Sequence, residues 1–459
     1  MAWRNALVAS LLVLTGSMWT PLRADTRAFK IVDDPLLDAA VAEARAEFMR
    51  NKPFDRLDAT ILIPAEDGSW RRGSFNGDAV AYPASCVKLA YMAAAMHWCR
   101  EHGLPYTHLD HAVRPMIEKS DNFQTGVVVD AITSAPNIDD LTSTTDPRWS
   151  EWIERRRYTA RWLDERGLLG NQVILHKTYP TNSGEWPRGA EKVARDVFGK
   201  NLMQPRLSAS LMLEIVKGAI EPDARDYMME LLNHDRWKSN SVLGFGLPPG
   251  SRYYNKPGLA YDTLEDIAYV VLPNGKECIV AAFSNAFCLP YSSDPDPHDS
   301  SQLGEFMELL IAKTGLGVGL PPTRIVTDSD DGTSFACAGV WSDEETSGVT
   351  ARVAVASQQT TPSATWRLGV PKDGKYEVCA RYPARDSRTK VLYTVRHTDG
   401  VSSRTVDQRK VHDRWVKLGD YQFRAGEGEI TVTAAGEGNL SSTSTLAAGK
   451  VRATLWPDL

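Results

Sequence analysis

Three short strings occur in a fixed order along this chain of 459 residues. The first joins Ser85 to Lys88, the second runs from Ser120 to Asn122, and the third begins at Lys256. A serine nucleophile, a neutral lysine base, a second serine that relays a proton and a second cation suffice for acyl transfer without histidine. A chain that uses this device must bring segments 35 and 136 residues apart into one cleft.

Taken singly, the strings carry unequal weight. A chain of this length contains roughly one or two S-x-x-K strings by chance, but well under about 0.1 S-D-N strings. A surface lysine one turn from a helix cap would explain the first string alone. A strand that ends in a turn would explain the third. Their order and spacing together are what favour catalysis.

The composition and the first residues limit the class of protein. With 42% hydrophobic and 24% charged residues, the chain is long enough for two or three domains with their own cores. A charged start, an apolar run over 6–19 and a small residue at Ala24 predict a secretory signal peptide over 1–24. An uncleaved anchor is the alternative. We expect a secreted or periplasmic protein with no stable membrane insertion after cleavage.

Charge and cysteine usage narrow the partners. Loss of residues 1–24 removes two of the 52 basic residues and none of the 58 acidic ones, so the formal charge of −6 becomes −8. This balance argues against nucleic acid and anionic membranes as partners. The six cysteines lack metal-ligand spacing, and we predict neither a metal nor another cofactor. Cys278 could pair with Cys288 and Cys337 with Cys379, or these thiols could be free and buried.

Residue patterns outline a first domain over 25–320. They predict an amphipathic helix from Pro35 with Asp34 as its cap, a hairpin of strands over 57–63 and 70–75, and an apolar helix over 85–100. Ser85 would start that buried helix. Further helices are expected over 122–132, 149–167, 208–219 and 301–313, and further strands over 252–256, 266–272 and 278–284.

Two stretches of this domain have no catalytic interpretation. Four arginines of the helix over 149–167 are interpreted as a solvated face rather than an anion site; they are Arg155, Arg156, Arg157 and Arg161. A segment rich in proline and glycine over 171–199 is expected to be an irregular excursion.

The chemistry of the strings follows from their spacing. Positions i and i+3 of a helix share a face, so Ser85 and Lys88 can come within hydrogen-bond reach. A lysine at its ordinary pKa is protonated, but burial and a second ammonium from Lys256 would lower the pKa of Lys88. Ser120 would then relay a proton to the leaving group. The predicted catalytic residues are Ser85, Lys88, Ser120 and Lys256.

Three further residues are predicted to bind substrate. Asn122 would orient a substrate amide and hold Lys88, while Asp121 supports the loop. Gly258 would let the backbone approach closely. The amides of Ser85 and Leu259 would form an oxyanion hole.

With their flanking residues, the strings resemble the serine β-lactamase and penicillin-binding superfamily, closest to the class A layout, over about 34–316. The resemblance rests on residues 82–88, 116–122, 254–258 and 266–271. It implies an α/β (α+β) fold in which a five-stranded antiparallel sheet is flanked by helices. The active site would lie between this sheet and a helical subdomain.

Two departures from class A enzymes bear on the substrate. Pro257 stands where those enzymes carry Thr or Ser, which removes a hydroxyl that would bind a substrate carboxylate. They also carry a loop glutamate that activates the deacylating water, and the best match here, over 176–182, offers Tyr179 at that place. Glu185 could substitute if the loop folds differently. Efficient hydrolysis of penicillin is therefore not expected.

After Pro322 the residue pattern changes to short runs that are typical of β-strands, which predict a β-sandwich over 323–459. This tail resembles the golvesin C-terminal-like domain, which is also attached to extracellular polysaccharide-degrading enzymes. Exposed tryptophans of such a sandwich could stack on sugars, although tryptophans are more often core residues. The matching strings lie over 335–341, 364–366, 376–383, 393–395, 406–409 and 415–419.

Three functions remain at this point. The first is a secreted serine hydrolase that acts through an acyl-Ser85 intermediate on an amide or ester, such as a peptidoglycan-type peptide. The second is a class A-like β-lactamase. The third is a non-catalytic cell-surface protein whose tail binds polysaccharide, and retention of all four catalytic residues argues against it.

Overall fold

A computed structural model describes eleven stretches of the chain. They cover residues 29–50, 55–233, 242–248, 250–285, 302–320, 324–346, 349–356, 361–383, 385–409, 415–435 and 444–455. The predicted signal peptide and Cys288 lie outside them. None of the helices described is long and apolar enough to cross a membrane. We call residues 29–320 the first region and residues 324–455 the second region.

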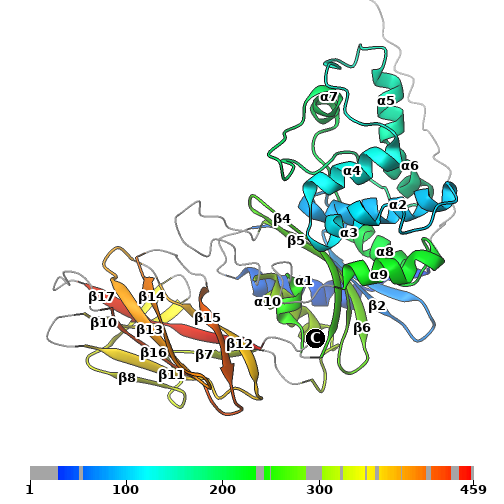
Figure 1. Cartoon of the computed structure of the whole chain (residues 1–459). Coiled ribbons are helices and arrows are strands. Elements are labelled where there is room, and N and C mark those ends of the chain that lie inside the picture. Colours follow the sequence, from blue (N-terminus) through cyan, green and yellow to red (C-terminus); the bar gives the residue numbers. More distant parts are fainter. Residues whose placement is uncertain are drawn as a thin grey trace, which may run out of the picture.

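The first region is built on one sheet with helices on both faces (Figure 1). Its strand order is β1-β3-β2-β6-β5-β4, so strands from both ends of the region meet where β2 pairs with β6. Five strands form the antiparallel sheet that was predicted, and a three-residue β1 adds to its edge in parallel with β3. The strands are β1 Ile31–Asp33, β2 Leu57–Pro64, β3 Trp70–Phe75, β4 Arg252–Ala260, β5 Thr263–Val271 and β6 Glu277–Ser284.

Helices α1 (Pro35–Met49) and α10 (Gln302–Lys313) cover one face of this sheet (Figure 1). The Asp34 side chain caps α1 as predicted, because its Oδ1 accepts from the Leu36 amide at 2.9 Å. The rings of Phe48 and Phe306 meet between the two helices, 5.9 Å apart.

Eight of the described helices form a layer on the other side of the sheet, in which α2 and α8 share one hydrophobic core with the sheet and α5 and α7 lie farther from it (Figure 1). Alternation along β5 sends Ile267 into this core and Ala268 into the opposite one. The helices are α2 Lys88–Glu101, α3 Asp110–Glu118, α4 Asn122–Thr133, α5 Trp149–Arg156, α6 Tyr158–Glu165, α7 Gly189–Phe198, α8 Pro205–Val216 and α9 Arg225–Leu232.

Three predictions for the helical layer were wrong. The single helix expected over 149–167 is split at Arg157, because Trp152 packs in one core and Trp162 in another. Arg156 is fully buried rather than solvated. The segment over 171–199, expected to be irregular, contains helix α7, which was missed because the glycine at its start, Gly189, is typical of a turn. Glycine is needed there because a Cβ would lie 2.2 Å from the Ile138 carbonyl oxygen.

The second region is entirely β-structure in its described part. Sheets of five strands (β14-β13-β16-β11-β8), four strands (β15-β12-β18-β7) and three strands (β17-β10-β9) share one core. Trp366 is fully buried in that core and cannot stack on a sugar. The strands are β7 Arg324–Thr327, β8 Phe335–Ala338, β9 Ser342–Thr346, β10 Val349–Val355, β11 Ser363–Arg367, β12 Gly374–Arg381, β13 Lys390–His397, β14 Gly400–Asp407, β15 Val416–Phe423, β16 Glu429–Ala434, β17 Thr445–Ala448 and β18 Lys450–Leu455.

The suggested pairing of Cys337 with Cys379 is absent. Cys337 is exposed on β8 and Cys379 is buried on β12, in a different sheet, and the two form no disulfide with each other. The Cys379 thiol instead donates to Glu377 Oε1 at 3.4 Å. Cys278 is buried, and its suggested pairing with Cys288 lies outside the described residues.

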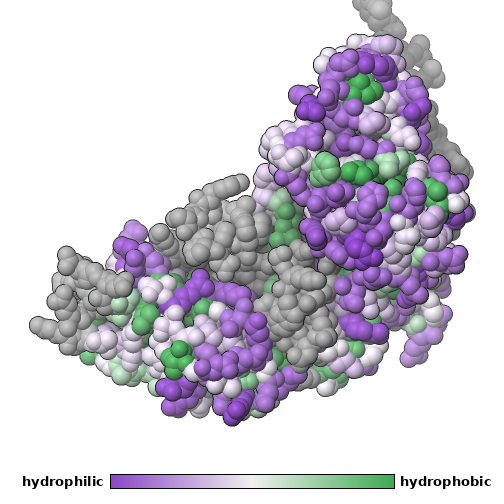
Figure 2. Space-filling model, in the orientation of Figure 1, coloured by the Kyte–Doolittle hydropathy of each residue, from purple (hydrophilic) through white to green (hydrophobic). Residues whose placement is uncertain are grey.

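The coloured surface over the helical layer is largely hydrophilic in the view of Figure 2, with small hydrophobic patches between. Scattered apolar residues are common on the surfaces of folded proteins and need no special cause. Charged groups that are buried inside the protein do need a specific cause, and several of them lie in the first region. Lys88, Lys256, Arg156 and Glu191 are each at most 1% exposed.

Candidate active site

Ser85 lies in a single 3₁₀ turn, Ala84–Val87, that precedes α2. The predicted helix therefore begins three residues later than expected, at Lys88. Ala84 has a φ of 42°, and the Cys86 amide donates to the Pro83 carbonyl at 2.8 Å. The Ser85 side chain is half-buried and forms no hydrogen bond with the described residues.

The Lys88 amine is fully buried and turns toward the second string. Its Nζ lies 2.5 Å from the Ser120 carbonyl oxygen, 3.2 Å from Ser120 Oγ and 2.7 Å from Asn122 Oδ1. Burial holds the pKa of Lys88 well below its usual range, and the charge of Lys256 lowers it further. The environment thus disfavours the ammonium form of Lys88.

Ser120 occupies the junction between α3 and α4 in the left-handed conformation, with a φ of 54°. Asp121 then caps α4, because its Oδ1 accepts from the Gln124 amide at 2.9 Å. This junction aims Ser120 Oγ between two lysines, 3.2 Å from Lys88 Nζ and 3.1 Å from Lys256 Nζ. When Lys88 is protonated, this hydroxyl accepts from both amines and can donate its own proton elsewhere.

Lys256 reaches this hydroxyl from β4, the edge strand of the sheet. Its side chain is fully buried, and burial lowers the pKa of Lys256 to about 8. Its Nζ also donates to the Pro257 carbonyl at 3.1 Å.

Glycine is required at position 258, where β4 touches the turn that holds Ser85. A Cβ on Gly258 would lie 2.5 Å from the Pro83 carbonyl oxygen and 3.1 Å from Cys86 Sγ. The Cys86 thiol donates to the Lys256 carbonyl at 3.2 Å and ties the turn to the strand. Leu259 follows on the same edge strand, half-buried beside this contact.

Asn122 connects the lysine to the loop over 176–182. Its Oδ1 accepts from Lys88, its Nδ2 donates to the Pro180 carbonyl at 2.9 Å, and its amide faces Asn182 Oδ1 at 3.3 Å. Asn122 therefore holds Lys88 as predicted. Because both ends of its side-chain amide are engaged within the protein, Asn122 positions groups of the site.

The two residues considered for water activation have other partners among the described residues. Tyr179 is buried beneath the Arg195 guanidinium, 5.5 Å from the ring centroid, and burial followed by nearby Glu191 raises its pKa. Glu185 is 41% exposed and faces Arg188 at 3.8 Å. Neither side chain bonds to Lys88, Ser120 or Asn122.

Sequence reasoning missed two buried carboxyl groups on β5. Asp266 accepts from the Leu243 amide at 3.1 Å and Asn255 Nδ2 at 2.9 Å, and burial raises its pKa to about 6. Glu265 lies opposite Gly258 in the register of β4 and β5. Burial raises the pKa of Glu265 well above its usual range, and Arg56 Nη2 lies 3.7 Å from Glu265 Oε1. Two adjacent acids within an apolar strand were the signal for a buried polar network.

Comparison with known proteins agrees with this architecture. Residues 98–298 match the model of the beta-lactamase enzyme family, and residues 325–451 match the golvesin C-terminal domain. The first match begins after Ser85 and Lys88. Golvesin of Dictyostelium discoideum is 32% identical over 433 residues, which are 93% of this chain and 74% of that protein. The chain belongs to the golvesin family.

Solved structures similar to this golvesin-family chain include a beta-lactamase from Sphaerobacter thermophilus and PBP-A. Each is 19% identical, covers 62% of this chain and 98% of its own, and has a TM-score of 0.42. The superfamily and the C-terminal domain type predicted from the sequence are confirmed by the two family matches. The fold class is confirmed by the helices and sheets described above.

Proposed function

We propose that this chain is a serine hydrolase that forms an acyl-enzyme at Ser85 with an amide or ester substrate. The observation that carries the proposal is the Ser120 hydroxyl, which lies within 3.2 Å of two fully buried lysine amines. Burial lowers the pKa of both amines. The beta-lactamase family match over 98–298 supports a serine hydrolase-type fold for this region.

Acylation starts with proton removal from Ser85. The neutral Lys88 amine is the base, and the Ser85 oxygen attacks the substrate carbonyl carbon while its proton passes to Lys88 Nζ. The amides of Ser85 and Leu259 would hold the resulting oxyanion, since β4 packs against the turn of Ser85 at Gly258.

Collapse of this intermediate needs a proton for the leaving group. Lys88 Nζ donates to Ser120 Oγ, and the Ser120 proton moves to the departing nitrogen or oxygen. Lys256 stays 3.1 Å from the same hydroxyl and stabilises negative charge on it during the transfer. The products are the freed amine or alcohol and acyl-Ser85.

Deacylation runs through the same groups with water as the nucleophile. Among the described residues, the titratable groups that contact Ser120 are the two lysines Lys88 and Lys256 and no carboxylate, since Tyr179 and Glu185 contact other groups. Lys88 would therefore have to serve as the base again. We therefore expect acyl-Ser85 to accumulate. This expectation favours a hydrolase for peptide-like substrates, such as peptidoglycan-type peptides, over a β-lactamase that turns over rapidly.

Intact-mass spectrometry after exposure to penicillin, a depsipeptide and simple esters tests the proposal. We expect a covalent adduct on the wild type that disappears slowly, and none on Ser85→Ala. Ser150→Ala, which changes an exposed serine on α5, is the matched control and should still form the adduct. A fluorophosphonate should label the wild type and Ser150→Ala alone. Equal labelling of Ser85→Ala contradicts the proposal.

A β-lactamase activity makes a different prediction for nitrocefin. Sustained turnover after the first burst would favour the β-lactamase, whereas a burst followed by a slow rate favours a long-lived acyl-enzyme. Export by the predicted signal peptide is the companion proposal for location, and N-terminal sequencing of the mature protein checks cleavage after Ala24.

A further inference from the structure

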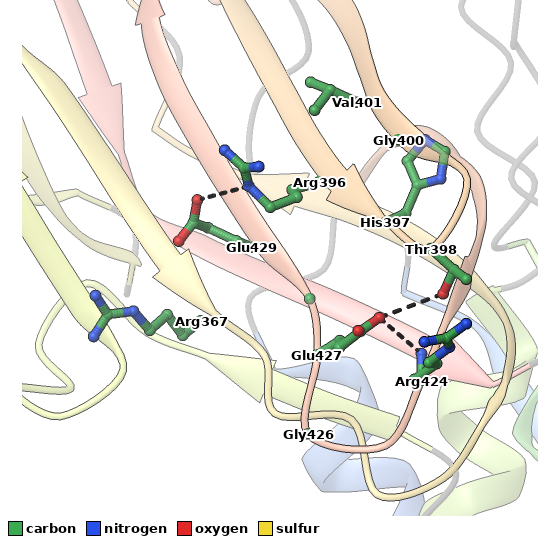
Figure 3. Close-up of a pocket in the computed structure, with 11 residues that line it drawn as sticks. Arg367, Arg396, His397, Thr398, Gly400, Val401, Arg424, Gly426, Glu427 and Glu429 are labelled. Carbon is green, nitrogen blue, oxygen red and sulfur yellow. Dashed lines mark hydrogen bonds and ion pairs between the residues drawn. The ribbon is translucent and has the colours of Figure 1, made fainter.

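The second region has a hollow of about 490 Å³ at one end of the β13–β14 hairpin (Figure 3). Its wall comes from the end of β11, the turn that joins β13 to β14, and the segment between β15 and β16. The volume falls within the roughly 300–1,000 Å³ of small-molecule sites, so a bare ion would not fill it.

Three arginines line this hollow, and two of them have guanidinium groups that pair with no described carboxylate. Arg396 Nε faces Glu429 Oε1 at 3.5 Å. Arg367 and Arg424, by contrast, form no ion pair with a described carboxylate. Figure 3 shows these two on opposite sides of the lining, with Glu427 between them. The hollow therefore offers two separated cationic groups to a ligand.

The two carboxylates at the same hollow are held by the protein. Glu427 Oε2 accepts from the Arg424 amide at 3.2 Å and the Thr398 hydroxyl at 3.4 Å, and Glu429 is paired with Arg396. Their remaining lone pairs can accept hydrogen bonds from hydroxyl groups.

The backbone at the rim is open. Gly400 and Gly426 have φ values of 125° and 81°, and a Cβ on either would meet nothing within 4 Å. A broad ligand can therefore approach the turns without meeting side chains there.

We propose that this hollow binds an acidic saccharide, a chain of sugar rings that carry carboxylate groups. Guanidinium forks recognise carboxylates through paired hydrogen bonds, and Arg367 and Arg424 would engage carboxylates on different rings. Glu427 and Thr398 would meet ring hydroxyls between them. The proposal does not depend on acyl chemistry at Ser85.

Titration calorimetry on the full chain with oligogalacturonate tests the proposal. We expect measurable binding, with an affinity at least about tenfold lower in the double variant Arg367→Ala/Arg424→Ala. A neutral oligosaccharide of equal length and inorganic phosphate should bind at least about tenfold more weakly than oligogalacturonate. Ser85→Ala should bind it like the wild type, which separates this site from the acyl chemistry.

The double variant Lys390→Ala/Arg409→Ala is the matched control. It removes the same charge from the opposite end of the same hairpin, where Lys390 on β13 lies opposite Asp407 on β14 in the strand register. We expect its affinity to stay within about twofold of the wild type. Equal loss in both double variants would show general attraction and overturn the proposal. Absence of binding to oligogalacturonate, or tighter binding of a single-stranded DNA oligonucleotide, would do the same.

Discussion

The first region buries its cations in two contrasting ways. Lys88 and Lys256 are fully buried and form no ion pair with a described carboxylate, and the pKa of each is lowered. Arg156 is fully buried as well, but Asp130 Oδ1 lies 2.9 Å from its Nη1 and Glu191 Oε1 contacts its Nη2. Burial alone would lower the pKa of Arg156, yet the two carboxylates outweigh it and raise the pKa.

The difference shows what turns a buried cation into a base. Without a counter-ion, desolvation drives the proton off and leaves a lone pair that can accept one. With two carboxylates, the charge is fixed and the residue becomes a structural tie between α5, α4 and α7. Four substitutions can test this comparison.

Lys88→Met should have the largest effect. Loss of the base should slow acylation of Ser85 by about 10²–10⁴-fold. The free energy of unfolding should not fall, because a buried amine without a counter-ion gives way to an apolar chain. Burst kinetics and urea unfolding measure the two quantities. Lys119→Met, an exposed neighbour of Ser120, is the control and should acylate at the wild-type rate.

Arg156→Met should have the opposite profile. It leaves Glu191 and Asp130 without their partner in a buried setting, so the free energy of unfolding should fall by about 3–5 kcal/mol. The folded fraction should still acylate at nearly the normal rate. Arg155→Met, whose side chain is 54% exposed and pairs with Glu151, should cost less than about 1 kcal/mol. Similar losses in the two variants would contradict the contrast.

Alkaline pH should reveal Lys256 through stability. Its pKa of about 8 in the folded chain lies below the ordinary value of 10.5, so between these pH values the unfolded chain binds more protons. The contribution of Lys256 to the free energy of unfolding therefore rises with pH across this window, by about 3 kcal/mol in full, in addition to the rise that Lys88 contributes. Lys256→Met should lose the Lys256 contribution and show a smaller rise, whereas Lys119→Met should follow the wild type. Parallel curves for wild type and Lys256→Met would refute the assignment.

The contrast also explains what could be predicted from the sequence. Lys88, Ser120, Asn122 and Lys256 belong to ordered local strings, and the structure brings all four together as expected. The fold class followed from the same strings. Arg156 was misjudged because its partners lie 26 and 35 residues away on other helices, and nothing local to a run of arginines marks one as buried.

The elements that were missed have similar causes. Helix α7 was hidden by Gly189, which is needed for close contact with the Ile138 carbonyl rather than for a loop. The position of Tyr179 depends on Arg195 and Glu191, both supplied by that unpredicted helix. The sequence pattern located the loop over 176–182, but the direction of its side chains required the tertiary contacts.

Asn122→Asp should give the smallest and most specific effect, because it gives Lys88 a carboxylate partner of the kind that Arg156 has. The new carboxylate would stand where Asn122 Oδ1 now lies, 2.7 Å from Lys88 Nζ, and would raise the pKa of that amine. A protonated Lys88 cannot take the Ser85 proton, so acylation at pH 7 should fall by about 10–100-fold. The rate should recover as pH rises, since the base is masked rather than removed.

Asn182→Asp separates this effect from a general loss of loop structure. Asn182 Oδ1 accepts from the Asn122 backbone amide at 3.3 Å but makes no bond to Lys88. The Asn182→Asp variant should therefore change the rate of acylation by less than about threefold. A shift of the pH–rate profile in Asn122→Asp alone identifies Lys88 as the group that titrates. If the pH–rate profile keeps its wild-type position while the rate falls at every pH, a group other than Lys88 is the base. Lys88 would then differ from Arg156 in its contacts but not in its chemical role.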